Sequence, residues 1–104
     1  MQRFSAHQLA DYLKEHKPRL IDVREPWEFD ICHLQNSELV PMGQVPARLQ
    51  LFHESPEYVI ICHHGIRSLQ VINFLAHHGI QNTINLDGGV DAWAREIDLT
   101  MPLY

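Results

Sequence analysis

The 104-residue sequence is poor in several features that would place it in a special class of protein. It contains only two cysteines, Cys32 and Cys62, and no C-x-x-C pair, so it has neither a disulfide framework nor the common redox motif. No apolar run is as long as a membrane span, and the residues after Met1 do not form the apolar core of a signal peptide. We therefore expect a cytoplasmic protein that makes no membrane contact and keeps its thiols reduced.

Basic residues are also few. Eight lysines and arginines against 13 aspartates and glutamates give a net charge of -5 with neutral histidines, which leaves no basic excess for binding nucleic acid. Hydrophobic residues make up 45% and charged residues 20%, which are ordinary values for a globular protein. Because the chain has no repeat, low-complexity segment or linker, we expect a single domain over residues 1–104.

Short apolar runs alternate along the chain with helical patterns. The predicted strands are residues 20–23, 39–40, 58–61 and 83–86. A capping box of Ser5 with Gln8 predicts a first helix, which cannot continue through Pro18. Further helices are predicted to start at Pro26 and Pro46, to end at Gly79, and to cover residues 90–97. This alternation predicts an α/β fold with a small, mainly parallel sheet and helices on both faces.

The chemistry is predicted to centre on Cys62. The run Tyr58–Ile61 has no polar alternation, which indicates a strand buried on both faces, and Cys62 follows at its carboxyl end. The next residues must turn from strand into helix, and such a turn directs N–H groups and the positive end of a helix toward one point. An electropositive setting of this kind lowers the pKa of a thiol from about 8.5 to about 3.5–7.5. We interpret Cys62 as a nucleophile in an anion-binding loop rather than a buried structural cysteine.

Arg67 stands near the start of the helix that follows the loop, where a cation opposes the helix macrodipole. This unfavourable position predicts a partner, either Asp22, Glu28 or an anionic substrate. We favour a structural ion pair, because the guanidinium fork matches a carboxylate. Together with Arg24, the two carboxylates are expected to form a network that supports the loop.

His63 and His64 titrate near neutral pH, and they either assist proton transfer and orient the donor or remain exposed loop side chains. A metal held with Cys62 and the pair His77-His78 would need four ligands that converge. Because neighbouring histidines are expected to point in different directions, we predict no metal site.

Ser68 either donates to the sulfur or caps the helix, and capping is the favoured interpretation. Trp27 and Trp93 are interpreted as core or pocket-wall residues.

Three motifs resemble those of a single-domain rhodanese, a sulfurtransferase module. Leu20–Arg24 opens the resemblance, with Glu28-Phe29 and His33-Leu34 following it. The second motif, Cys62–Ser68, reads Cys-His-His-Gly-Ile-Arg-Ser, and the third is Leu-Asp-Gly-Gly at residues 86–89, with Trp93 after it. The resemblance extends from about residue 5 to residue 101, and the order and spacing of the motifs make it strong.

The resemblance implies an α/β fold in which the loop from Cys62 to Arg67 is the catalytic pocket. Cys62 would accept a sulfane sulfur from a small anionic donor such as thiosulfate, and pass it from a persulfide to cyanide or a cellular thiol. No cofactor is expected. The residues expected to bind substrate are His63, His64, Gly65, Ile66, Arg67 and Ser68, with Asp22, Arg24 and Glu28 as support.

The spacing within the loop bears on the reaction. Related phosphatases have a Cys-x5-Arg motif, with five residues between the cysteine and the arginine. In this sequence only four residues separate Cys62 from Arg67. The narrower loop suits a sulfur atom better than a tetrahedral phosphate and argues against phosphatase or arsenate reductase activity. The alternative function that stays open is a persulfide carrier or docking module dedicated to a protein partner.

Two positions depart from the family pattern. Cys32 stands where the family usually has glycine, and it is either a resolving thiol for Cys62 or an inert hydrophobic side chain. His63 and His64 replace the additional basic residues of members specialised for thiosulfate, so fewer fixed positive charges face a dianion.

Overall fold

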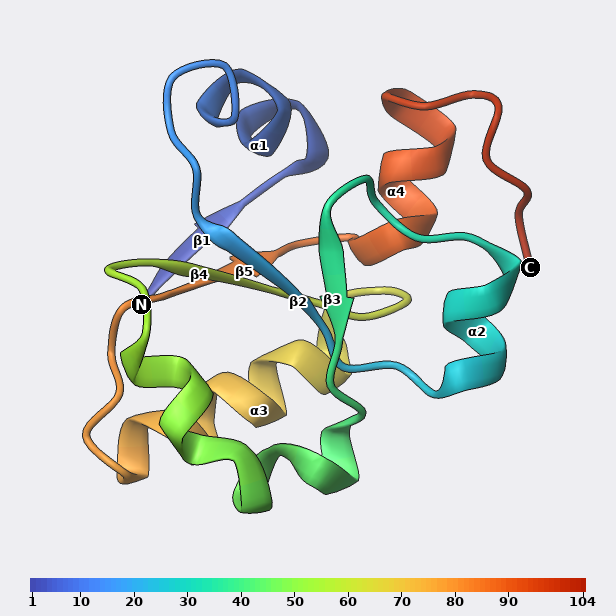
Figure 1. Ribbon diagram of the computed structural model, residues 1–104. Coiled ribbons are helices and arrows are strands. Elements are labelled where there is room, and N and C mark those ends of the chain that lie inside the picture. Colours follow the sequence, from blue (N-terminus) through green and yellow to red (C-terminus); the bar gives the residue numbers. More distant parts are fainter.

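Strands and helices alternate along the whole chain in the computed structural model, which describes residues 1–104 (Figure 1). The strands are β1 (Gln2–Phe4), β2 (Arg19–Asp22), β3 (Ser37–Leu39), β4 (Tyr58–Ile61) and β5 (Thr83–Leu86). The α-helices are α1 (Ala6–Tyr12), α2 (Pro26–Ile31), α3 (Ile66–His77) and α4 (Gly89–Glu96), and η1 (Met42–His53) is a 3-10 helix. The predicted α/β class is confirmed.

The five strands form one parallel sheet in the order β1-β5-β4-β2-β3. All four residues of β4 are buried, as expected for a central strand covered on both faces. In the register of the sheet, Ile61 at the end of β4 lies opposite Asp22 at the end of β2. The carboxyl ends of β2, β4 and β5 therefore meet at one edge of the sheet, which is where an open α/β sheet binds its ligands.

Helices cover both faces of the sheet, as predicted (Figure 1). One face packs against α3 and η1 through a core cluster that includes Phe52, Ile60, Cys62 and Leu75. The other face packs against α1 and α4 through a second cluster that includes Leu9, Cys32, Ile61 and Val90. The sheet thus separates the two cysteines, and both are free thiols.

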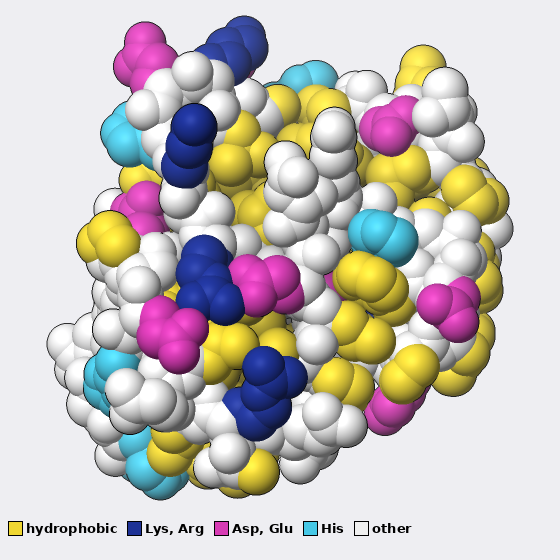
Figure 2. Space-filling model, in the orientation of Figure 1, with side chains coloured by type: hydrophobic (Ala, Val, Ile, Leu, Met, Phe, Trp, Pro, Cys, Tyr) yellow, Lys and Arg dark blue, Asp and Glu magenta, His cyan; other side chains and the backbone are white.

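Basic and acidic side chains are interspersed on the face shown in Figure 2, and the dark blue lysines and arginines form no continuous basic patch there. Arg19, at the start of β2, pairs with Glu38 at 2.6 Å and with Glu54 at 2.8 Å. No helix in the structure combines the length and the apolarity that crossing a bilayer would need.

The capping box that begins α1 is confirmed. The backbone N–H of Gln8 donates to Ser5 Oγ at 3.2 Å, and the N–H of Ser5 donates to Gln8 Oε1 at 2.8 Å. The predicted helix start at Pro46 is wrong, because η1 begins at Met42 and includes the proline. A kink at Arg48 (φ -126°, ψ 29°) divides η1. The segment therefore lacks the continuous ladder of backbone hydrogen bonds that a proline would interrupt, and it can include Pro46.

Candidate active site

The loop from Cys62 to Gly65 joins the central strand β4 to helix α3. Gly65 is the N-cap of α3 and has a φ of +96°. A Cβ atom at this position would lie 3.2 Å from the carbonyl oxygen of Leu86 and 3.1 Å from the nitrogen of Gly88. Glycine is therefore required here for two reasons: it can adopt the positive φ, and it leaves room for the turn between β5 and α4.

Two backbone N–H groups of the loop and helix donate to the sulfur of Cys62. Gly65 N lies 3.1 Å and Ser68 N lies 3.3 Å from Sγ, and the hydroxyl of Ser68 is also 3.3 Å away. Cys62 is only 1% exposed. The sulfur thus lies at the base of a turn and the first turn of α3, in a setting where N–H dipoles stabilise negative charge.

The expected cap at Ser68 is wrong, because the N-cap position belongs to Gly65 and no side chain caps α3. The hydroxyl of Ser68 instead donates to Asn85 Oδ1 at 2.5 Å. Asn85 Nδ2 in turn donates to Asp87 Oδ1 at 2.6 Å, which fixes the orientation of the amide. Asn85 was not predicted as a site residue, although a polar amide side chain between Ile84 and Leu86 in a buried strand was an available signal.

Arg67 pairs with Glu28, one of the three partners left open by the sequence. Its guanidinium donates to both carboxylate oxygens of Glu28, at 2.7 and 2.8 Å. The hydrogen bond from Arg67 lowers the pKa of Glu28 to about 2, against an ordinary value of 4.5, although burial of the carboxylate opposes this shift. The positive charge of Arg67 is thus neutralised from within the fold, and the ion pair ties α3 to α2.

Arg24 is completely buried and forms the second part of this network. It donates to Asp22 Oδ2 at 2.7 Å, to the carbonyl oxygen of Cys32 at 2.6 Å and to the hydroxyl of Tyr104 at 2.7 Å. Tyr104 donates in turn to Glu28 Oε2 at 2.9 Å. Burial is the main reason why the pKa of Tyr104 rises to about 12, so its hydroxyl remains a donor at neutral pH.

Cys32 has extended backbone angles, φ -167° and ψ 152°, so this position does not require the glycine that is usual in the resembled family. Its side chain packs in the cluster on the opposite face of the sheet from Cys62. This packing favours the interpretation of Cys32 as a small hydrophobic residue over that of a resolving thiol.

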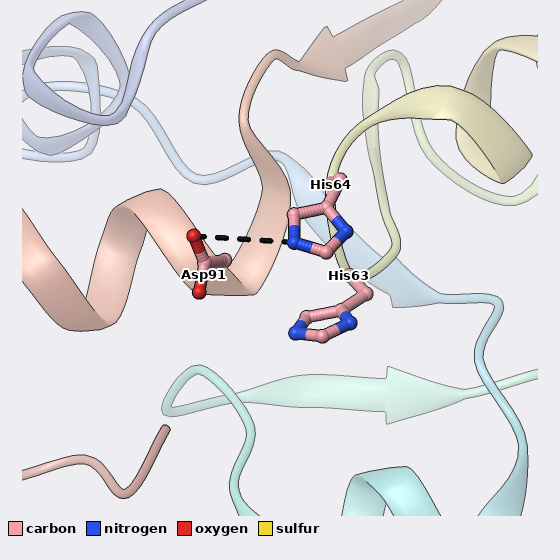
Figure 3. A group of neighbouring side chains, drawn as sticks. All are labelled: His63, His64 and Asp91. Atoms are coloured by element: carbon pink, nitrogen blue, oxygen red, sulfur yellow. Dashed lines mark ion pairs between the residues drawn. The ribbon is translucent and has the colours of Figure 1, made fainter. Parts of the chain in front are cut away.

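His63 and His64 lie beside each other at the loop, with ring centroids 4.0 Å apart (Figure 3). The expectation that neighbouring histidines point in different directions is therefore wrong for this pair. The ring of His63 also stacks on Tyr104 at 3.9 Å, and its burial lowers the pKa of His63. The side chain of His64 is 59% exposed, and its Nε2 lies 4.0 Å from Asp91 Oδ2.

The first turn of α4 packs directly on the loop from Cys62 to Gly65. The N–H of Val90 donates to the carbonyl oxygen of Cys62 at 2.9 Å, and the N–H of Asp91 donates to that of His63 at 3.0 Å. A Cβ atom on Gly89 would lie 2.4 Å from both of these carbonyl oxygens. The loop therefore depends on the absence of a side chain at Gly89.

The two tryptophans differ in their surroundings. Trp27 on α2 is 62% exposed, so it is not a core residue, and its role as a pocket-wall residue stays a prediction. Trp93 on α4 is partly buried and packs against the second cluster, in agreement with the prediction.

Comparison with known proteins agrees with this architecture. Residues 5–96 match the family model of the rhodanese-like domain. The chain belongs to the rhodanese-like domain family. The rhodanese-like domain protein of Staphylococcus aureus, a solved structure, superposes with a TM-score of 0.82 and 34% identity, over 89% of this chain and 91% of that one.

Among the curated relatives, the putative sulfurtransferase YtwF of Bacillus subtilis is 36% identical over 77 residues, which cover 74% of each protein. The thiosulfate sulfurtransferase GlpE of Vibrio cholerae is 29% identical over 80% of this chain and 78% of that protein. The probable adenylyltransferase/sulfurtransferase MoeZ of Mycobacterium tuberculosis is 31% identical over 93% of this chain, but the matched region is only 26% of the length of MoeZ. Sulfur transfer is the general activity that these comparisons support.

The ion pair under the loop of this rhodanese-like domain should be visible in its acid stability. Because the pKa of Glu28 is about 2 in the folded state, the ion pair stabilises the domain above pH 4.5, and this contribution is lost as the pH falls toward 2. We expect Glu28 to account for a loss of about 2 kcal/mol of unfolding free energy between pH 6 and pH 3. Urea unfolding over this pH range measures the effect.

The matched variants for this measurement are Glu28→Gln and Asp30→Asn, both on α2. Glu28→Gln should reduce the acid-induced loss of unfolding free energy by about 2 kcal/mol. Asp30→Asn, at an exposed position, should leave this loss unchanged. An acid dependence in Glu28→Gln that runs parallel to that of the wild type would contradict the role of this carboxylate.

Proposed function

We propose that this domain transfers sulfane sulfur through a persulfide on Cys62. The observation that carries the proposal is the position of the Cys62 sulfur at the carboxyl end of β4, where the N–H groups of Gly65 and Ser68 donate to it. The named sulfurtransferases among its relatives support the same chemistry. A reducing compartment such as the cytoplasm would keep both thiols in the free form that this reaction needs.

The reaction divides into two displacements at sulfur. In the first, the Cys62 thiolate attacks the sulfane sulfur of thiosulfate, the S–S bond of the donor breaks, and sulfite leaves with the electron pair. In the second, cyanide or another thiophile attacks the outer sulfur of the persulfide and the Cys62 thiolate departs. Both displacements balance without an external oxidant or reductant, and each leaves an anionic sulfur for the same N–H groups to stabilise.

Arg67 contributes to this reaction by positioning. Since both oxygens of Glu28 already occupy its guanidinium, Arg67 holds the start of α3 in place rather than offering a free charge to the donor. We expect an incoming donor to meet His63 and His64 in the loop and Ile66 at the start of α3. Because Cys62 is almost completely buried, a small or slender donor reaches its sulfur most easily.

A protein acceptor is the second candidate, in which the domain acts as a persulfide carrier. Ile66, directly after the loop, is 68% exposed, and an exposed aliphatic side chain beside the nucleophile suits contact with a protein surface. In this case persulfide formation would be rapid while turnover with small acceptors stayed negligible.

Steady-state kinetics with thiosulfate and cyanide test the proposal and separate the two candidates. An enzyme of the proposed type gives saturable thiocyanate formation, with parallel double-reciprocal lines because donor and acceptor react in separate steps. A dedicated carrier gives at most one thiocyanate per protein. Hydrolysis of an aryl phosphate at Cys62, without any sulfur transfer, would contradict both.

A further inference from the structure

Three potential metal ligands gather beside the catalytic loop. One ligand atom each from His63, His64 and Asp91 lies within 4.8 Å of the others. Figure 3 shows both imidazole rings on the same side of the loop, with the Asp91 carboxylate facing them from α4. None of these contacts involves the sulfur of Cys62, so the three ligand atoms are distinct from the nucleophile of the proposed sulfur transfer.

A second observation points to a ligand at this cluster. Nε2 of His63 is shielded from solvent and has no hydrogen-bond partner. A buried polar atom without a partner is destabilising, and structures seldom keep such an atom without a reason. The stacking on Tyr104 holds the ring of His63 in this position, so the nitrogen is already oriented.

The backbone also fixes the two sides of the cluster relative to each other. The N–H of Asp91 donates to the carbonyl oxygen of His63 at 3.0 Å, which ties the loop to the first turn of α4. His64 and Asp91 only need to rotate exposed or partly exposed side chains to approach His63, since their side chains are 59% and 20% exposed. The arrangement is therefore largely preformed.

We propose that His63, His64 and Asp91 bind a divalent transition-metal ion of the zinc type. Two imidazoles and one carboxylate form a donor set that suits Zn²⁺, and three protein ligands leave the fourth tetrahedral position open. Magnesium and calcium ions prefer sites made of oxygen atoms and fit poorly here. Bond lengths of about 2.0–2.2 Å require the three ligand atoms to move closer together than they lie in the structure.

Arg95 competes with the metal for Asp91. Its Nε donates to Asp91 Oδ2 at 3.0 Å, in an ion pair between successive turns of α4. An exposed pair of this kind contributes about 0.2–1 kcal/mol, so Arg95→Gln should strengthen metal binding up to about fivefold. Arg95 makes no contact with the Cys62 loop in the hydrogen-bond network described above.

The chain offers a matched control in a second pair of adjacent histidines. His77 and His78 lie at the end of α3, where their Nδ1 atoms contact the carbonyl oxygens of Asn73 and Phe74 at 2.8 and 3.0 Å. They belong to no cluster with a carboxylate. The double variant His77→Gln/His78→Gln removes as many imidazoles as the proposed site contains and should leave binding unchanged.

The test is titration of the full, chelator-treated chain with Zn²⁺ by calorimetry and with Co²⁺ by visible absorption. We expect one ion per chain, and at least tenfold weaker binding in both His64→Gln and Asp91→Asn. Cys62→Ser should bind as the wild type does, with no sulfur-to-cobalt charge-transfer band in either protein.

Loss of binding in Cys62→Ser, or wild-type affinity in Asp91→Asn, would overturn the proposal, because the ion would then sit on the thiol or elsewhere. Absence of binding to the wild type would overturn it as well. Since the measurement uses no sulfur donor, it stands or falls separately from the proposed sulfur transfer.

Discussion

Replacing Cys62 by serine is expected to reduce sulfur transfer from thiosulfate to cyanide by at least about a thousandfold, because removal of a covalent nucleophile eliminates the reaction path rather than weakening a contact. A hydroxyl group at this position is not ionised at neutral pH and attacks sulfane sulfur poorly. The substitution nearly conserves volume, so the fold should be unchanged. Thiocyanate formation and the circular dichroism of the two proteins measure these two effects.

Cys32→Ser is the control for this variant. Its side chain lies on the opposite face of the sheet, in a different core cluster, so its removal should leave turnover within about twofold while lowering stability modestly. Substantial turnover in Cys62→Ser, or a loss confined to Cys32→Ser in a folded protein, would show that the nucleophile has been assigned to the wrong thiol.

Gly89→Ala is expected to destabilise the fold by about 3 kcal/mol or more, from the combined cost of a left-handed alanine and of overpacking. Gly89 has a φ of +60°, and a Cβ atom would lie 2.4 Å from the carbonyl oxygens of Cys62 and His63. Both contacts involve backbone atoms, which cannot rotate away as a side chain does. Because these carbonyl groups belong to the loop that holds the proposed nucleophile, activity should fall together with stability.

Gly79→Ala separates the clash from the backbone conformation. Gly79 has a similar φ of +78°, but a Cβ atom there would have no neighbour within 4 Å. Its substitution should therefore cost only about 1–2 kcal/mol, the price of the left-handed conformation alone. Urea denaturation of both variants measures the difference, and equal costs at the two positions would show that the loop and α4 are not packed as described.

The sequence predicted those features of the site that depend on local order along the chain. Cys62 was located from the buried run that precedes it and the helix pattern that follows it, and the structure places it at the carboxyl end of β4. The unfavourable cation at Arg67 correctly indicated a partner, and Glu28 was one of the candidates. Such inferences succeed because strand, turn and helix signals all act within a few residues.

Contacts that depend on the register of the sheet could not be predicted from the sequence. Asn85 reaches Ser68 because β5 pairs with β4 so that Asn85 lies opposite Ile60, and no local pattern encodes this pairing. The cap expected at Ser68 failed because α3 begins at Ile66, so Ser68 lies inside the helix and its hydroxyl donates to Asn85 instead. Tyr104 joins Arg24 to Glu28 from the end of the chain, where no periodic pattern identified it.

Two errors in the elements have a similar origin. The strand β1 was missed because it is short and two of its three residues are exposed, so that it shows no buried apolar run. The 3-10 helix η1 starts four residues before Pro46, since consecutive short turns tolerate a proline that an α-helix would not. Tertiary packing decides such segments more than local propensity does.

The most direct test of the central claim is the intact mass of the protein after incubation with thiosulfate. The account predicts a gain of one sulfur atom, about 32 Da, located on the peptide that contains Cys62 and removed by cyanide, as a covalent intermediate requires. An unchanged mass under conditions in which thiocyanate is formed, or added sulfur located on Cys32, would contradict a persulfide on Cys62 as the carrier of the transferred sulfur.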